Sequence, residues 1–135
     1  NDGAVESSER YRIYPYIREE MPDVLAAAEL VLSRSGAGTV WESAAAGRPM
    51  VLVPLSGRGT RGDQVENARF FEKAGAAVVL SGGDANPDRL AETIASLAAG
   101  DARREAMAAA SARIGAGDGA ALIADILIQC AGEKV

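Results

Sequence analysis

The sequence has 135 residues, of which 48% are hydrophobic and 4% aromatic, and its formal net charge is −5. This length predicts one domain with a core of Ala, Val, Leu and Ile, as in α/β layer structures. The acidic balance argues against a nucleic-acid partner, because phosphates require a basic surface. The single cysteine, Cys130, excludes an intramolecular disulfide and fits a reducing cytoplasm, and the chain has no histidine to serve as a general base or metal ligand.

The N-terminal quarter predicts short elements around two prolines. Residues 1–9 are polar and predict a loop, whereas the alternation over residues 11–14 predicts a strand that ends at Pro15. A helix is expected over residues 22–28, with Pro22 in its first turn. No apolar run approaches the roughly 20 residues of a membrane span.

The central stretch, residues 30–54, predicts a strand, a turn, a helix and a second strand. An apolar run over residues 30–33 is followed by a glycine-bearing turn over residues 35–38. Thr39 is expected to begin a helix that stops at Gly47 and Pro49, and residues 50–53 form the next apolar run. A glycine turn that enters a helix presents free backbone N–H groups and the positive end of the helix dipole, so the pattern indicates an anion site, with phosphate as the usual occupant.

The remaining residues predict further alternation of helices and strands. A glycine- and arginine-rich loop over residues 55–62 leads into a helix over residues 63–74, a strand over 76–80 and helices over 86–99, 101–114 and 118–130. Asn86, Asp101 and Asp118 are the expected N-caps of those last three helices. The helix over residues 63–74 is expected to bury Val65, Ala68 and Phe71, with Phe70 as a further candidate. The helix over residues 118–130 is expected to bury Leu122, Ile123, Ile126, Leu127 and Cys130.

Several short strings occur together in an order that is specific as a combination, although no single one of them is. They are Ser35-Gly-Ala-Gly-Thr-Val-Trp-Glu42, Ala44-Ala-Ala-Gly-Arg-Pro49, Val53-Pro-Leu55, Gly62-Asp-Gln64, Asn67-Ala68 and Glu72-Lys-Ala-Gly-Ala-Ala77. The combination resembles the C-terminal, donor-binding half of the MurG family, the family 28 UDP-GlcNAc:lipid I N-acetylglucosaminyltransferases of peptidoglycan synthesis.

The resemblance implies a fold and an activity. The fold is a Rossmann-like GT-B C-terminal domain spanning residues 1–135, with a parallel sheet flanked by helices and lacking its N-terminal strands. The activity is inverting transfer of GlcNAc from UDP-GlcNAc to lipid I, peripherally at the inner face of the cell membrane. The acceptor site and general base would lie in an absent N-terminal domain, so this chain alone is expected to be inactive. Because the resemblance implies two further strands that this sequence lacks, we expect either a homodimer of the chain or a rearranged edge of the sheet.

The resemblance also implies roles for individual residues. Uracil would lie against Ile17. The diphosphate and ribose of UDP would bind Ser35, Gly36, Ala37, Gly38, Thr39 and Glu42. The donor sugar would contact Asp63, Gln64 and Asn67. No cofactor is implied, and no metal is indicated because the chain has no Asp-x-Asp pair.

Structural roles compete with these assignments. Thr39 and Glu42 have the spacing of a capping box, in which Thr39 is the N-cap and Glu42 bonds back to it. Asp63 and Glu66 have the same spacing, and Ile17 could be an ordinary core residue.

Other functions also fit the same residues. The chain could be a stand-alone donor-binding subunit of a split glycosyltransferase, or part of a UDP-sugar transferase acting on another lipid or a natural product. A dinucleotide-binding module ranks last, because no Gly-x-Gly-x-x-Gly string follows a first strand.

Overall fold

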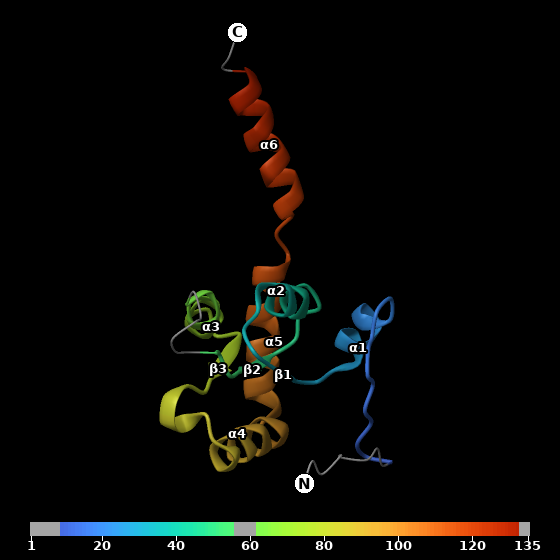
Figure 1. Ribbon diagram of the computed structural model, residues 1–135, viewed down its shortest axis with the longest axis vertical. Coiled ribbons are helices and arrows are strands. Elements are labelled where there is room, and N and C mark those ends of the chain that lie inside the picture. Colours follow the sequence, from blue (N-terminus) through green and yellow to red (C-terminus); the bar gives the residue numbers. More distant parts are fainter. Residues whose placement is uncertain (1–8, 56–61, 133–135) are drawn as a thin grey trace.

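A computed structural model describes residues 9–55 and 62–132. Its centre is a parallel sheet of the strands β1 (Val31–Ser33), β2 (Met50–Leu52) and β3 (Ala77–Val79), in the order β1-β2-β3 (Figure 1). Met50 is aligned with Val31 on one side and with Ala77 on the other. The helix α2 (Ala37–Ala45) connects β1 to β2, and α3 (Asp63–Lys73) connects β2 to β3. The predicted α/β class with a parallel sheet is therefore confirmed.

Successive residues of β2 point to opposite faces of the sheet, and each face has its own core cluster. Met50 and Leu52 pack with α2 and α3, including the fully buried Val40 and Phe71. Val51 packs on the other face with Leu97 of α4 (Pro87–Ala99). The helix α5 (Asp101–Gly115) contributes to both clusters, and Figure 1 shows it crossing behind the sheet from α4 to α2. The three short strands are thus enclosed by helices on both faces.

The contact between α5 and α2 is unusually close. A Cβ atom added to Gly115 would overlap the backbone of Ala44 and Ala45. Beside this point, the Ser111 hydroxyl, which is fully buried, donates a hydrogen bond to the carbonyl oxygen of Arg48 at 2.7 Å. The end of α5 therefore lies directly on the backbone of α2, where any side chain larger than hydrogen would hold the helices apart.

The N-terminal segment differs from the prediction. Residues 11–14 form no strand, and the first helix, α1 (Met21–Ala27), begins one residue earlier than expected. In Figure 1 this blue segment runs along the far side of α1, away from the sheet. A strand requires a neighbouring strand for its hydrogen bonds, and none of the described strands lies beside residues 11–14, so the alternation alone was misleading.

Two of the predicted helix caps are confirmed and three are wrong. The Oδ1 atom of Asn86 accepts a hydrogen bond from the N–H of Arg89, and that of Asp118 from Ala121, each at 3.0 Å. In contrast, α2, α3 and α5 begin after Gly36, Gly62 and Gly100. Thr39, Asp63 and Asp101 therefore lie inside these helices, because each preceding glycine provides the non-helical backbone of the N-cap position. A short 3-10 turn, Gly82–Asp84, precedes the Asn86 cap.

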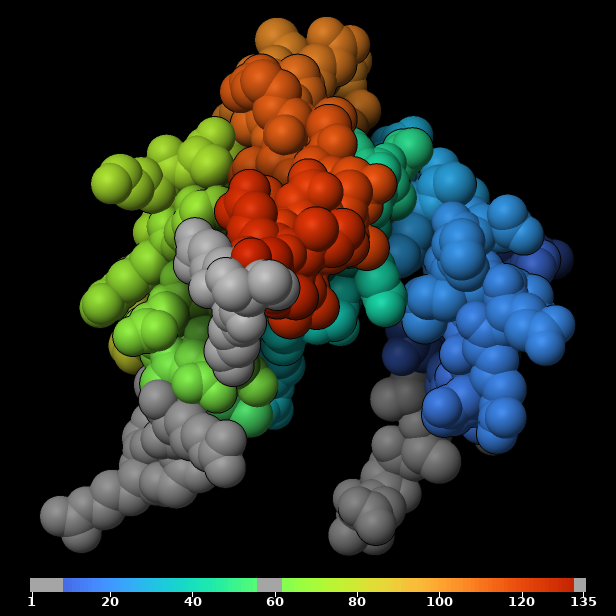
Figure 2. Space-filling view, turned by 90° about the horizontal axis from the view of Figure 1, so that it is seen from above, coloured from blue at the N-terminus to red at the C-terminus, as the bar shows by residue number. Residues whose placement is uncertain are grey.

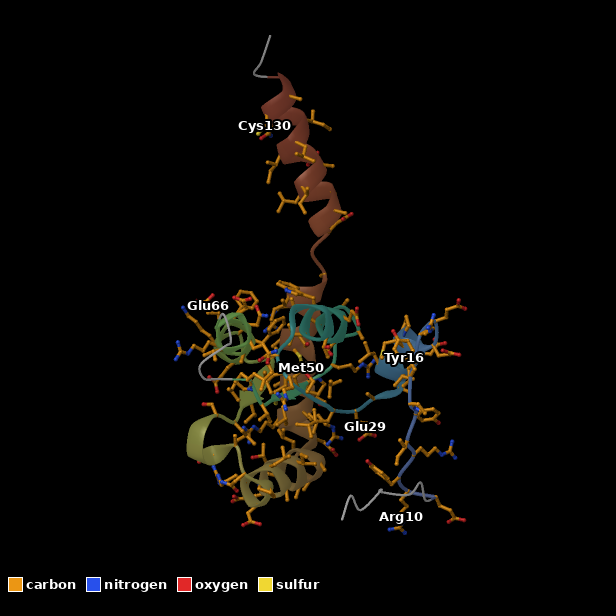
Figure 3. All side chains as sticks on the ribbon, in the orientation of Figure 1. Arg10, Tyr16, Glu29, Met50, Glu66 and Cys130 are labelled. Atoms are coloured by element: carbon orange, nitrogen blue, oxygen red, sulfur yellow. The ribbon has the colours of Figure 1, made fainter. Side chains whose placement is uncertain are left out.

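The last helix, α6 (Gly119–Gly132), is confirmed as a helix, but its predicted burial is wrong. Leu122, Ile123, Ile126 and Leu127 are each about half to two thirds exposed, and Cys130 is also exposed. Figures 1 and 3 show α6 extending away from the rest of the molecule, with Cys130 near its far end. The periodicity identified the apolar side of the helix but contained no information about what packs on it.

The stretch Asp101–Gly132, which joins α5 and α6, is long and apolar enough to cross a membrane by length and composition alone. Buried helices of soluble proteins pass the same test, and part of α5 packs in both core clusters. This finding qualifies the expectation that no apolar run approaches a membrane span, whereas the two separate helices predicted over residues 101–114 and 118–130 are confirmed as α5 and α6.

Replacing Gly115 by alanine tests the close contact of α5 with α2. Gly115→Ala should lower the free energy of unfolding by about 1–3 kcal/mol, the usual cost of overpacking, measured by urea denaturation. Gly119→Ala is the matched control, because among the described residues nothing lies within 4 Å of an added Cβ atom there. Equal stability of the two variants would contradict the packing described above.

Candidate functional site

The turn between β1 and α2 has the geometry of an anion site. The first hydrogen bond of α2 runs from the N–H of Val40 to the carbonyl oxygen of Gly36 at 3.1 Å. The N–H groups of Ala37, Gly38 and Thr39 precede it and have no acceptor within the helix. All three residues are exposed. Three backbone donors and the positive end of the helix dipole therefore face outward at this turn.

Glu42 does not cap α2. It is the sixth residue of the helix, too far along to bond to the N-cap, so the capping-box interpretation of Thr39 and Glu42 is wrong. Its Oε1 atom lies 3.9 Å from the position that a Cβ atom on Gly38 would occupy. The carboxylate therefore points back along the helix toward the turn, and it is exposed.

A cleft of about 990 Å³ lies between α2 and the N-terminal segment with α1. In Figure 2 a hollow separates the blue N-terminal segment from the teal α2. Ile17 and Glu42, to which the family resemblance assigned the uracil and the ribose, both line this cleft. The other lining residues are Tyr16, Arg18, Glu19, Met21, Pro22, Leu25, Ala26, Ala45 and Ala46. The cleft thus combines an apolar wall with one carboxylate that lies next to the glycine turn.

Arg48 holds the two walls of this cleft together. Its Nη1 atom donates to the carbonyl oxygen of Ala28 at 3.1 Å, and its Nε atom donates to that of Ala46 at 2.8 Å. Ala28 and Ala46 are the C-cap residues of α1 and α2, so Arg48 donates to the C-terminal ends of both helices. None of the seven residues of α1, all of them described, is buried, so packing alone holds this wall weakly. The sequence analysis assigned no role to Arg48, although the residue belongs to the Ala44-Ala-Ala-Gly-Arg-Pro49 string.

On the other side of the turn, α3 brings three predicted site residues together. Ser35 is fully buried, and its hydroxyl donates to the carbonyl oxygen of Gln64 at 2.6 Å. The Asn67 Nδ2 atom donates to the carbonyl oxygen of Ser35 at 3.0 Å. The Gln64 Oε1 atom accepts from the N–H of Leu55 at 2.9 Å. These bonds join α3 to the ends of both β1 and β2.

Asp63 is the first residue of α3 and is exposed, so its capping-box interpretation is wrong as well. It follows Gly62, whose φ of 82° is in the left-handed region that favours glycine. The predicted loop over residues 55–62 lies mostly outside the described residues. Within the described ranges, no group of three or more His, Cys, Asp or Glu side chains is placed to hold a metal ion.

Named relatives match more than half of this chain. The chain is 58% identical over 83 residues to the "UDP-N-acetylglucosamine--N-acetylmuramyl-(pentapeptide) pyrophosphoryl-undecaprenol N-acetylglucosamine transferase" of Treponema denticola, a match covering 62% of this chain and 21% of that protein. Proteins of the same name from Treponema pallidum (strain Nichols) and Clostridium perfringens (strain SM101) are 43% and 44% identical, over 72% and 71% of this chain. The matched region spans about a fifth to a quarter of the length of these relatives.

A solved structure and a family model agree with these relatives. The crystal structure of the glycotransferase of kitacinnamycin superposes with a TM-score of 0.61 and 27% identity, covering 80% of this chain and 27% of that one. The model of the glycosyltransferase family 28 C-terminal domain matches residues 1–125. A match over nearly the whole chain shows that this protein belongs to the glycosyltransferase family 28 C-terminal domain family.

Proposed function

We propose that this chain binds the nucleotide of UDP-GlcNAc, as the donor-binding part of an inverting transferase that adds GlcNAc to lipid I in peptidoglycan synthesis. The observation that carries the proposal is the cleft, which places Ile17 and Glu42 on facing walls. Glu42 in turn lies beside Gly38, within the run of free backbone donors. Base, ribose and diphosphate could therefore bind in sequence along one continuous surface.

Each part of the nucleotide has a chemically suitable partner in this arrangement. The diphosphate would accept hydrogen bonds from the N–H groups of Ala37, Gly38 and Thr39, whose orientation is fixed by α2. The same groups would stabilise the charge that develops on UDP as it leaves, without a metal ion. The Glu42 carboxylate would accept hydrogen bonds from the ribose hydroxyls, and charged acceptors make stronger bonds than neutral ones.

The remaining parts of the proposal rest on the family resemblance. The donor sugar would extend toward α3, where Asp63, Gln64 and Asn67 offer both donors and acceptors. The acceptor and the general base are assigned to the N-terminal domain of a longer protein that acts peripherally at the inner face of the membrane. For the chain as given we expect donor binding without turnover, and the homodimer stays a prediction.

A transferase acting on another lipid or a natural product is the second candidate, and a stand-alone subunit of a split glycosyltransferase is a third. The second is favoured by the superposition with the glycotransferase of kitacinnamycin. The identities of 43% to 58% with the relatives named for peptidoglycan chemistry, against 27% for that structure, favour the first proposal. Tighter binding of UDP-glucose than of UDP-GlcNAc would reverse this order.

Calorimetric titration with UDP tests the role of Glu42, because the two interpretations predict opposite signs. If the carboxylate binds ribose, Glu42→Ala should weaken UDP binding about tenfold, as expected for a lost hydrogen bond to a charged group. If Glu42 is only a nearby negative charge, removing it should tighten binding of the anionic diphosphate. Unchanged or tighter binding would therefore contradict the proposed contact.

Two comparisons make this test specific. The wild type should bind 2′-deoxy-UDP more weakly than UDP, whereas Glu42→Ala should bind the two ligands about equally. Glu72→Ala is the matched control, because it removes the same charge from an exposed position on α3 outside the cleft. It should change UDP affinity less than twofold.

Arg48→Met tests whether the wall formed by α1 contributes to binding. The loss of two hydrogen bonds to Ala28 and Ala46 should release α1 from α2 and weaken UDP binding several-fold. Amide hydrogen exchange in residues 21–27 should become faster in the same variant, while exchange in β2 stays slow. Arg103→Met, an exposed change on α5, is the control. Unchanged exchange in α1 would show that packing holds this wall without Arg48.

A further inference from the structure

We propose that Asn67 and Ser35 are positioning residues, which hold the turn before α2 in the shape that presents its backbone donors. In this role they affect binding of the whole nucleotide diphosphate, whether or not a sugar is attached. The inference rests on the proposed nucleotide site, and it replaces the donor-sugar contact that the proposed function carries over for Asn67 from the family resemblance.

The hydrogen bonds of Ser35 are the first support. Two polar groups of this fully buried residue bond to α3: the hydroxyl donates to the Gln64 carbonyl at 2.6 Å, and the backbone carbonyl accepts from the Asn67 amide at 3.0 Å. The partners are 29 and 32 residues away in the sequence, so these are tertiary contacts. Ser35 directly precedes Gly36, the N-cap of α2. Ser35, which leads into the N-terminus of α2, is thus hydrogen-bonded to a different helix, α3.

The lack of packing around the turn is the second support. Among the described residues, no atom lies within 4 Å of a Cβ atom added to Gly36, and Glu42 Oε1 is the one atom that near to a Cβ on Gly38. Glycine has a wide range of accessible backbone conformations. Because no side chain packs closely on Gly36, the bonds to Ser35 restrain the turn in addition to the backbone bonds that join Gly36 to Arg34 and Val40.

The chemistry of the Asn67 amide is the third support. Its Nδ2 atom already donates to Ser35. A sugar could bond only to the remaining donor hydrogen and the Oδ1 atom. A residue acting solely through the sugar would affect UDP-GlcNAc binding and leave UDP unchanged. A residue acting through Ser35 would affect both ligands by the same factor, and this difference can be measured.

The experiment compares UDP and UDP-GlcNAc binding to the 135-residue chain by calorimetry. Asn67→Ala should weaken the binding of both ligands about fivefold, the effect of one lost hydrogen bond. Asn67→Leu, which keeps the number and branching of the side-chain heavy atoms but removes the amide, and Ser35→Ala should act in the same direction. Glu66→Gln, an exposed neighbour on α3, should change neither affinity more than twofold. Selective weakening of UDP-GlcNAc, or no weakening of either ligand, would overturn the proposal.

A second readout, on the ligand-free chain, separates this inference from the proposed function. Backbone ¹⁵N relaxation should show lower order parameters at residues 36–39 in Asn67→Ala than in the wild type, with those of β2 unchanged. If the wild type binds no UDP but the turn loosens in the variant, the proposed function fails while the holding role of Asn67 stands. If the order parameters of the turn are unchanged, the holding role is overturned regardless of binding.

Discussion

The packing of one side of α2 against the sheet, α3 and α5 determines the position of the candidate site. Val40 and Ala44 are completely buried on that side, and Gly115 lets α5 lie directly on the backbone of α2. The opposite side of the helix is therefore presented to solvent at a fixed place, with its N-terminus at the end of β1. A helix held this rigidly can direct its free N–H groups at a ligand without reorganisation, which is the condition for effective stabilisation of negative charge.

Hydrogen bonds hold the two segments that this packing does not fix, the turn before α2 and the helix α1. The bonds from α3 to Ser35 fix the turn that leads into α2, and the bonds from Arg48 fix α1 across the cleft. Neither contact buries much apolar surface, so each is worth about 1 kcal/mol rather than the several that a core side chain contributes. The core thus supports the helix that carries the site, while a few hydrogen bonds set the shape of its two borders.

The sequence predicted the elements better than their edges. The apolar runs located all three strands, and Asn86 and Asp118 were correctly chosen as caps because an Asn or Asp before a helix has a local bonding partner. The N-caps predicted for α2, α3 and α5 were wrong because a glycine without a side-chain cap took that place. The exposed side of α6, the absent strand over residues 11–14, and the bonds of Arg48 and Asn67 depend on distant residues, so local patterns could not reveal them. Ile17 and Glu42 were selected through a family resemblance, and the cleft that joins them is a property of the folded chain.

The central claim is that the cleft and the N-terminus of α2 form one nucleotide site. The most direct test is a ¹H–¹⁵N titration of the chain with UDP, followed by the same titration with uridine. UDP should shift the amide signals of Ile17, Ala37, Gly38 and Thr39 together with a single dissociation constant, whereas uridine should shift that of Ile17 and leave the turn nearly unchanged. Shifts confined to other surfaces, or different dissociation constants for Ile17 and the turn, would contradict the claim.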